Sequence, residues 1–268
     1  MLHLRSVEID RKQIPSQPNY PFSLPLFQTF ERLNLTTPVT FFVGENGTGK
    51  STLLSALAAA IGSIVVGGAS LDNDPDLVSA KELSHCLKLQ WHAKTRKGFF
   101  LRAEDFINYT KRIAQLRTEM ENDLLRVDQT FHDRSDYARS LAKMPYAGQL
   151  HALRESYGEG LDKQSHGESF FSLFHSRFVP GGLYLLDEPE TPLSPLKQLS
   201  LIALLKDMEN QGGQFIIATH SPLLMAYPGA TIFSFDHTPL QPIAYNEIEH
   251  VNLTRDFLNN PDAFLRRL

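Results

Sequence analysis

Residues 39–52 read VTFFVGENGTGKST, and they decide the fold. The first five are apolar, aromatic or β-branched, as expected of a central strand that is covered on both faces. They run directly into a glycine-rich segment that satisfies the pattern G-x-x-x-x-G-K-[ST]. An Ala/Leu-rich stretch then predicts a helix from Ser51 to about Ile64. This order of strand, loop and helix predicts a phosphate-binding loop.

The residue types in this loop suit a bound nucleotide. Gly44, Gly47 and Gly49 let the backbone curl tightly, so that successive N–H groups point into one concavity. The start of the helix adds its partial positive charge to that anion site. We expect Lys50 to reach the β- and γ-phosphates and the Ser51 hydroxyl to ligate Mg²⁺. The predicted nucleotide-binding residues of this loop are Asn46, Gly47, Thr48, Gly49, Lys50, Ser51 and Thr52.

Two later apolar strands end in polar residues that suit the same chemistry. Leu183–Leu186 runs into Asp187 and Glu188, and a carboxylate at the carboxyl end of a parallel strand lies where ligands bind in open α/β sheets. Asp187 is expected to hold Mg²⁺, and Glu188 to polarise the attacking water as a general base. Phe215–Ala218 brings His220 to the same edge, where it can contact the γ-phosphate and hold the water or Glu188 in place. The alternatives are surface carboxylates without a ligand and a histidine that only caps its strand.

Strand and helix patterns alternate at both ends of the chain, and the middle is helical. Apolar residues recur every three or four positions from Asp105 to about Val127, and a more polar helical stretch continues to about Tyr157. The opening residues Leu2–Ile9 alternate apolar and polar, as in a half-buried strand. We therefore expect one α/β domain with a mainly parallel sheet core, an N-terminal β-subdomain and a helical insertion. The expected bounds are 1–268 for the domain, 1–104 and 166–268 for the core, and 105–165 for the insertion.

Composition excludes several classes of protein. With 268 residues, 42% of them hydrophobic, the chain suits one large domain and is too apolar to be mainly disordered. The 26 Lys and Arg against 30 Asp and Glu leave a net charge of −4, which argues against a general polyanion binder. Cys86 is the single cysteine, so an intrachain disulfide is excluded. No apolar run approaches the ~20 residues that cross a bilayer, and the N-terminus lacks the apolar region of a signal peptide. We therefore expect a cytoplasmic protein without membrane insertion.

The phosphate loop, the Asp-Glu strand and the strand-end histidine, in this order, resemble the ATP-binding-cassette (ABC) class of P-loop ATPases. The resemblance implies an ABC-type ATPase head of the P-loop NTPase fold, with ATP and Mg²⁺ as its cofactors. It also implies a serine–glycine signature about 20 residues before the Asp-Glu pair, and residues 164–170, QSHGESF, stand there. Ser165, Gly167 and Glu168 match that signature, and His166 replaces the usual glycine. In the class this segment begins a helix that points at the γ-phosphate bound by the other subunit, which implies an ATP-dependent homodimer.

Within this class, residues 44–50 and 187–190 resemble the SMC/RecF-like branch of predicted AAA ATPases more than they resemble transporter subunits. The resemblance implies a glutamine after an early strand, where it contacts Mg²⁺ and the water. The strand Phe99–Arg102 offers no glutamine, so Glu104 and Gln90 are the two candidates for that place. The inter-subunit loop of the class has only a loose match, at residues 191–194.

Other functions and contacts stay open at this level. Residues 94–97, KTRK, read as the basic turn of a hairpin between strands at Lys88–His92 and Phe99–Arg102. Such a hairpin indicates a nucleic-acid-associated ATP switch in DNA repair or defence, and a solvated turn is the alternative. Two further alternatives are the energy-supplying subunit of a membrane transporter and a nucleotide-gated toxin or defence component, whose effector would be another chain and thus an unknown protein partner. Adenine can stack on Tyr20 or Phe22, unless these rings belong to the core.

Overall fold

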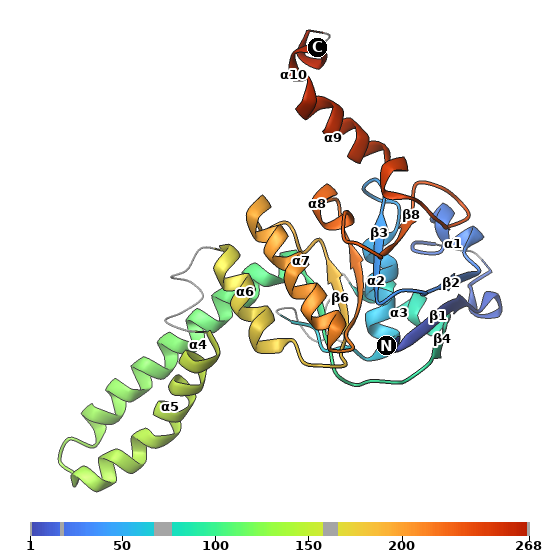
Figure 1. The fold of residues 1–268 in the computed structure, drawn as a ribbon. Helices are drawn as coiled ribbons and strands as arrows, with labels where there is room; N and C mark the ends of the chain where they lie inside the picture. The colour runs from blue at the N-terminus through green and yellow to red at the C-terminus, as the bar shows by residue number, and fades with distance from the viewer. Residues whose placement is uncertain (1, 17–18, 67–76, 158–165, 267–268) are drawn as a thin grey trace. The chain divides into compact units, whose positions relative to one another are not determined.

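The computed structural model describes residues 2–16, 19–66, 77–157 and 166–266 (Figure 1). The chain divides into two compact units, and each is described by itself. The α/β unit holds both sheets, and the helical unit is formed mainly by Glu104–Phe178. The helix that follows residue 165 therefore groups with the helical unit, whereas the expected insertion ends at 165.

A six-stranded sheet forms the centre of the α/β unit. Its spatial order is β5-β6-β7-β3-β8-β9, in which the first five strands are parallel and β9 is antiparallel to β8. The strands are β5 (Phe100–Arg102), β6 (Leu183–Asp187), β7 (Gln214–Ala218), β3 (Val39–Val43), β8 (Thr231–Ser234) and β9 (Gln241–Pro242). Every residue of β3, β6 and β7 is buried, which explains why these strands are continuous apolar runs in the sequence. The mainly parallel α/β core is thus confirmed.

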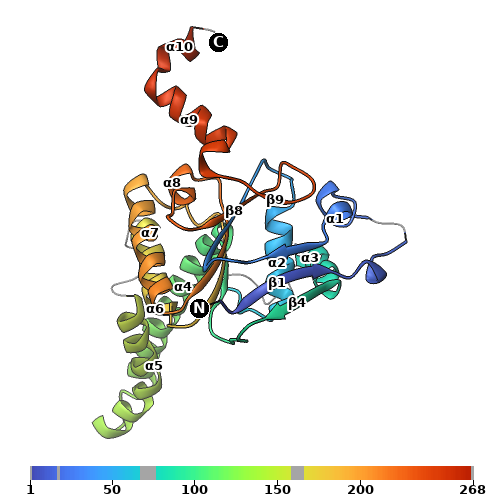
Figure 2. The ribbon, with the colours of Figure 1, turned by 45° about the vertical axis from the view of Figure 1, so that its right-hand side comes forward.

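Helices cover both faces of this sheet. Figure 2 shows α2 (Lys50–Ile61) and α7 (Pro195–Asn210) on opposite sides of it. The remaining helices of the α/β unit are short. They are α1 (Pro25–Thr29), α3 (Val78–His85), α8 (Pro222–Met225), α9 (Glu249–Asn259) and α10 (Pro261–Leu265), with 3₁₀ turns at Arg11–Gln13 and Tyr245–Glu247.

A second, antiparallel sheet forms the N-terminal β-subdomain. Its order is β2-β1-β4, from β2 (Arg32–Asn34), β1 (Leu4–Ile9) and β4 (Leu87–Trp91). Gln214, at the start of β7, anchors this sheet to the central one. Its buried side-chain Oε1 accepts hydrogen bonds from the backbone N–H groups of His3 and Leu4, each at 2.8 Å, and its Nε2 donates to Leu4 O at 2.9 Å.

The expected hairpin at residues 88–102 is wrong. β4 pairs with β1 in the N-terminal sheet, and β5 pairs with β6 in the central sheet, so residues 92–99 connect two sheets. Gly98 lies against β6 with a φ of +117°, and a Cβ there would stand 1.8 Å from Leu183 O. The expected basic surface is also reduced, because Arg102 is buried and Lys88 pairs with Asp10 at 2.8 Å.

The helical unit contains α4 (Ala103–Thr130), α5 (Asp136–Tyr157) and α6 (His166–Arg177). An ion pair between Lys143 and Asp128, at 2.6 Å, joins α5 to α4. Phenylalanine rings of α6 pack edge to face in a row that continues to α4: the ring centroids of Phe106 and Phe170 are 4.8 Å apart, and those of Phe170 and Phe174 are 4.4 Å apart. The amphipathic pattern predicted the first helix to within a few residues at each end.

Candidate functional site

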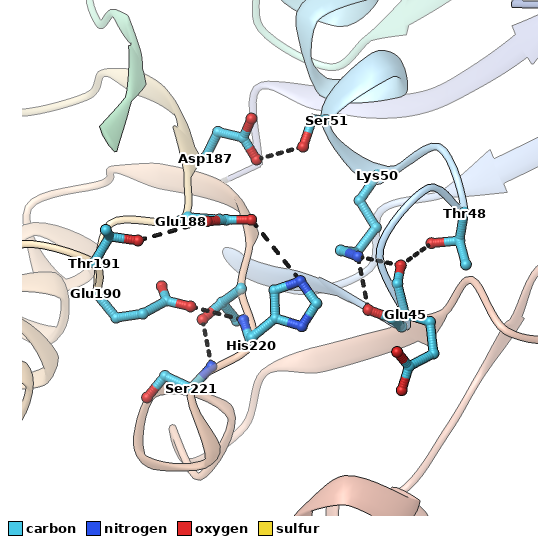
Figure 3. A network of polar contacts seen from close by, with 12 residues as sticks. Glu45, Thr48, Lys50, Ser51, Asp187, Glu188, Glu190, Thr191, His220 and Ser221 are labelled. Carbon is cyan, nitrogen blue, oxygen red and sulfur yellow. Dashed lines mark hydrogen bonds and ion pairs between the residues drawn. The ribbon is translucent and has the colours of Figure 1, made fainter. Parts of the chain in front are cut away.

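The phosphate loop connects β3 to α2 and has the backbone that the sequence predicts. Gly44, Gly47 and Gly49 all have positive φ, at 139°, 81° and 101°. Lys50, the first residue of α2, is buried, and its Nζ donates to Gly44 O at 2.6 Å and to Glu45 O at 2.7 Å (Figure 3). The lysine side chain therefore bends back over the loop, and its ammonium binds the carbonyl groups of the first two loop residues.

Burial lowers the pKa of Lys50, and nearby carboxylates oppose that shift. In order of decreasing effect, these carboxylates belong to Asp236, Glu188, Asp187 and Glu45. Asp236 follows β8, which lies beside β3 in the sheet. Three loops of the sheet edge thus supply negative charge around one ammonium.

Ser51 and Asp187 meet at the predicted metal position. Ser51 is in the first turn of α2, and its Oγ donates to Asp187 Oδ1 at 3.0 Å (Figure 3). Asp187 is the last residue of β6 and is buried. One hydroxyl and one carboxylate are hard oxygen ligands, and Mg²⁺ takes one or two such protein ligands together with water and phosphate oxygens. The pair therefore fits that cation.

Glu188 and His220 come together from neighbouring strands. His220 Nε2 lies 3.8 Å from Glu188 Oε1, which is too long for a hydrogen bond. The Nε2 atom is buried and has no hydrogen-bond partner among the described residues. Burial lowers the pKa of His220, and the Lys50 charge adds to that effect, so the imidazole is neutral near pH 7. A neutral ring can accept or donate one hydrogen bond at this position.

The backbone around Glu188 is held by hydrogen bonds. Its φ is 49°, and its N–H donates to the carbonyl oxygen of Ala218, the last residue of β7, at 2.9 Å. Thr191 N donates back to Glu188 O at 3.1 Å. These contacts fix the direction in which the carboxylate leaves the strand.

Glu190 joins the same two loops, although no motif in the sequence assigns it a role. Its Oε1 accepts a hydrogen bond from the backbone N–H of His220 at 2.7 Å (Figure 3). Burial raises the pKa of Glu190, and the Glu188 charge contributes to that shift. Sequence reasoning also passed over Asp236. The rule that singled out Asp187 and His220, a polar residue directly beyond an apolar strand, applies to Asp236 as well.

The remaining predicted site residues lie on other elements or outside the described residues. Ser165 lies outside the described residues, while Gly167 and Glu168 are in the first turn of α6 in the helical unit. Glu104 is in the first turn of α4. Gln90 is in β4, where its side chain contacts Ser6, Glu8 and Arg32 of the N-terminal sheet. The structure therefore argues against Gln90 as the glutamine of the site.

Tyr20 and Phe22 have different environments. The Tyr20 hydroxyl is 2.9 Å from Thr52 Oγ1 at the end of the phosphate loop, and 54% of the residue is exposed. Phe22 is buried in the hydrophobic core. Of the two aromatic candidates for stacking on a base, only Tyr20 offers an open ring beside the loop.

Residues 102–226, just under half of the chain, match the family model described as "AAA domain, putative AbiEii toxin, Type IV TA system". The matched range includes the Asp-Glu pair and His220 and begins after the phosphate loop. No curated protein matches the chain.

Two ATP-binding-cassette transporter structures are among the similar solved structures. One, titled "An inward-facing conformation of a putative metal-chelate type ABC transporter", is 18% identical, with 95% of this chain and 88% of that chain covered and a TM-score of 0.47. The other, the ADP conformation of an ATP-binding cassette of an ABC transporter, is 14% identical, with 91% and 90% covered and a TM-score of 0.43. Both TM-scores lie below 0.5, so these similarities assign no activity.

The sheet and the strand–loop–helix phosphate site define a P-loop protein of the α/β class. The family match, which covers the other half of the site, supports a P-loop ATPase. It does not distinguish the SMC/RecF-like branch, which stays a prediction. None of the described helices is long and apolar enough to span a bilayer.

Proposed function

We propose that this chain binds ATP and hydrolyses it with Mg²⁺, and that two copies enclose the nucleotide. The observation that carries the proposal is the convergence of three loops at one edge of the central sheet. Lys50 and Ser51 follow β3, Asp187 and Glu188 follow β6, and His220 follows β7. Each of these side chains has a contact with a second loop of this edge or with the loop's own backbone.

Binding of the triphosphate would use the phosphate loop. Backbone N–H groups of residues 46–52 would surround the β-phosphate, where the start of α2 favours negative charge. Lys50 would contact the β- and γ-phosphates, and the exposed ring of Tyr20 would stack on the adenine. Ser51 and Asp187 would hold Mg²⁺, which neutralises charge on the phosphates when it is bound.

Hydrolysis would begin with proton abstraction from water. Glu188 would act as the general base, because it directly follows the metal-binding residue Asp187 in the chain and its carboxylate is left free for the water. His220 would donate to or accept from the γ-phosphate or the water through Nε2, the buried atom that has no protein hydrogen bond. Catalysis would then come mainly from positioning and charge stabilisation.

The second copy would complete the site. The resemblance assigns Ser165, Gly167 and Glu168 to the γ-phosphate of the partner's nucleotide, and the first turn of α6 suits an anion. Glu104 would approach the metal-bound water. The SMC/RecF-like branch, with its soluble head, agrees with the Asp-Glu-Pro-Glu sequence at 187–190.

Phosphate release tests the proposal directly. We expect the wild-type chain to release phosphate from ATP with Mg²⁺ and not with EDTA. Ser51→Ala should raise the Mg²⁺ concentration for half-maximal turnover on the order of tenfold. Ser200→Ala, the same change at an exposed position of α7, is the control and should leave turnover unchanged. A wild-type chain that binds ATP but releases no phosphate would contradict hydrolysis and leave only nucleotide binding.

A further inference from the structure

We propose that Asp236 is a positioning residue of the phosphate loop, and that it holds Lys50 in place through a single peptide unit. The inference rests on the proposed nucleotide site and adds a residue that no motif of that site contains. It depends on three contacts, between Asp236 and Glu45, between Gly44 and Lys50, and between Glu45 and Lys50.

The sheet brings Asp236 to the start of the loop. β8 runs parallel to β3, with Ser234 opposite Val43, and Phe235 N donates to Val43 O at 2.8 Å. The next residue, Asp236, therefore stands beside the first residues of the loop. Its Oδ1 accepts a hydrogen bond from Glu45 N at 2.7 Å.

This approach needs a glycine at position 44. A Cβ on Gly44 would lie 2.8 Å from Asp236 Oδ1, closer than real Cβ contacts come, and the φ of +139° is itself unfavourable for other residues. The first glycine of the motif thus serves the aspartate contact as well as the turn.

The contact reaches Lys50 through the peptide unit between residues 44 and 45. This peptide unit consists of the Gly44 C=O and the Glu45 N–H. The Glu45 N–H donates to Asp236, and Gly44 O accepts from Lys50 Nζ at 2.6 Å. A carboxylate on the N–H polarises the same peptide and strengthens its carbonyl as an acceptor. The ammonium has three donors. Two of them go to Gly44 O and Glu45 O, which leaves the third to be shared between oxygens of the β- and γ-phosphates.

The surroundings of Asp236 make it a suitable residue for substitution. Its side chain is exposed and lines a pocket of about 770 Å³ with residues 45–48 of the loop. A substitution of Asp236 therefore removes no core packing. It is also the foremost of the carboxylates that favour the charged form of the buried Lys50.

A positioning role for Asp236 and simple charge repulsion predict opposite changes in the affinity for ATP. If Asp236 were only a negative charge near the phosphates, Asp236→Asn would tighten binding of the anionic nucleotide. If Asp236 positions Lys50, the same change weakens binding, because a neutral amide accepts the Glu45 N–H less strongly than a carboxylate does. The sign of the change in affinity therefore decides between the two.

The experiment is a titration of Mg-ATP into the wild type and three variants, followed by calorimetry. We expect Asp236→Asn to weaken ATP binding about threefold and Asp236→Ala about tenfold. Asp262→Asn, the same change at an exposed acid in the first turn of α10, should leave the affinity unchanged. Unchanged or tighter binding by Asp236→Asn or Asp236→Ala would overturn the inference. A wild-type chain that binds no ATP would instead overturn the proposed function.

A double-mutant cycle tests the route through Lys50. In a Lys50→Ala background, with affinities measured by competition against a fluorescent ATP analogue, Asp236→Asn should cause no further weakening. Equal weakening in both backgrounds would show that Asp236 supports the loop without Lys50, and the positioning role would fall.

Discussion

Glu188 has a φ of 49°, the one positive value at a residue other than glycine in the described part of the chain. The left-handed region costs an L-residue roughly 1–2 kcal/mol, and such residues persist where neighbouring contacts hold them. Here the contacts are the hydrogen bonds from Glu188 N to Ala218 O and from Thr191 N to Glu188 O. The direction of the proposed general base is therefore fixed by a positive φ that is unfavourable for glutamate.

This strain predicts an unusual order of stability. Glu188→Gly should be more stable than Glu188→Ala by about 1 kcal/mol, because both lose the carboxylate and only glycine accepts the positive φ without cost. Urea denaturation of the two variants measures the difference. At Ser200, inside α7, the same pair of substitutions should show the opposite order. If Glu188→Ala were the more stable variant, the backbone at this residue would not be strained.

Glu190 gives a pH-dependent prediction at the same scale. Burial raises its folded pKa above the ordinary 4.5, so the folded state binds the proton more tightly than the unfolded state. The stability from this group is present below pH 4.5 and is lost as the pH rises through the folded pKa. Glutamine keeps an acceptor for the His220 N–H and does not ionise. The stability of Glu190→Gln relative to wild type should therefore increase from about pH 4.5 upward, by denaturation at several pH values. A difference that stays constant with pH would contradict the raised pKa.

At the scale of elements, the sequence predicts best what local pattern determines. Val39–Val43 has the predicted bounds because a short run of apolar, aromatic and β-branched residues is typical of a strand that is covered on both faces. The helix from Ala103 to Thr130 follows from its amphipathic period. In contrast, the pattern predicts a hairpin for the segments of β4 and β5, because nothing within residues 88–102 shows that each strand has a distant partner. The short helices α3 and α9 lie outside the elements that the sequence analysis predicts.

The distinction between local pattern and distant pairing also explains which site residues can be predicted from the sequence. Lys50, Asp187, Glu188 and His220 could be found because each follows a strand that reads clearly in the sequence. The roles of Glu190 and Asp236 depend on which loops lie next to each other, as β6 does to β7 and β3 to β8. Neighbours in a parallel sheet are distant in sequence, so these two contacts needed the structure.

The hydrogen bonds that link the two sheets predict a large loss of stability when the Gln214 side-chain amide is removed. Gln214 is buried and makes three hydrogen bonds with the backbone of His3 and Leu4. Gln214→Leu would leave those groups without partners and should destabilise the fold by about 3 kcal/mol. Gln28→Ala, at an exposed position, should change stability by less than about 0.5 kcal/mol. Urea denaturation of both variants measures this, and a small effect at Gln214 would mean that the sheets are held together by apolar packing alone.

For the whole molecule, the proposed homodimer, in which two copies enclose the nucleotide, predicts a change in particle mass when ATP binds. Glu188→Gln should bind Mg-ATP without turnover and accumulate as a dimer of twice 30.2 kDa, because the partner's signature contacts persist while the γ-phosphate remains. Light scattering in saturating ATP measures this, with ADP as the control that should leave a monomer. A monomeric Glu188→Gln protein in saturating ATP would contradict the homodimer but not the hydrolytic site of each chain.

The central claim is that the edge formed by Lys50, Asp187, Glu188 and His220 hydrolyses ATP with Glu188 as the base. The most direct measurement is the identity of the nucleotide that stays bound after incubation with Mg-ATP, separated by gel filtration and analysed by chromatography. We predict ADP on the wild type, intact ATP on Glu188→Gln, and turnover by Glu188→Gln at least about 100-fold slower. ADP on Glu188→Gln at the wild-type rate would contradict the account.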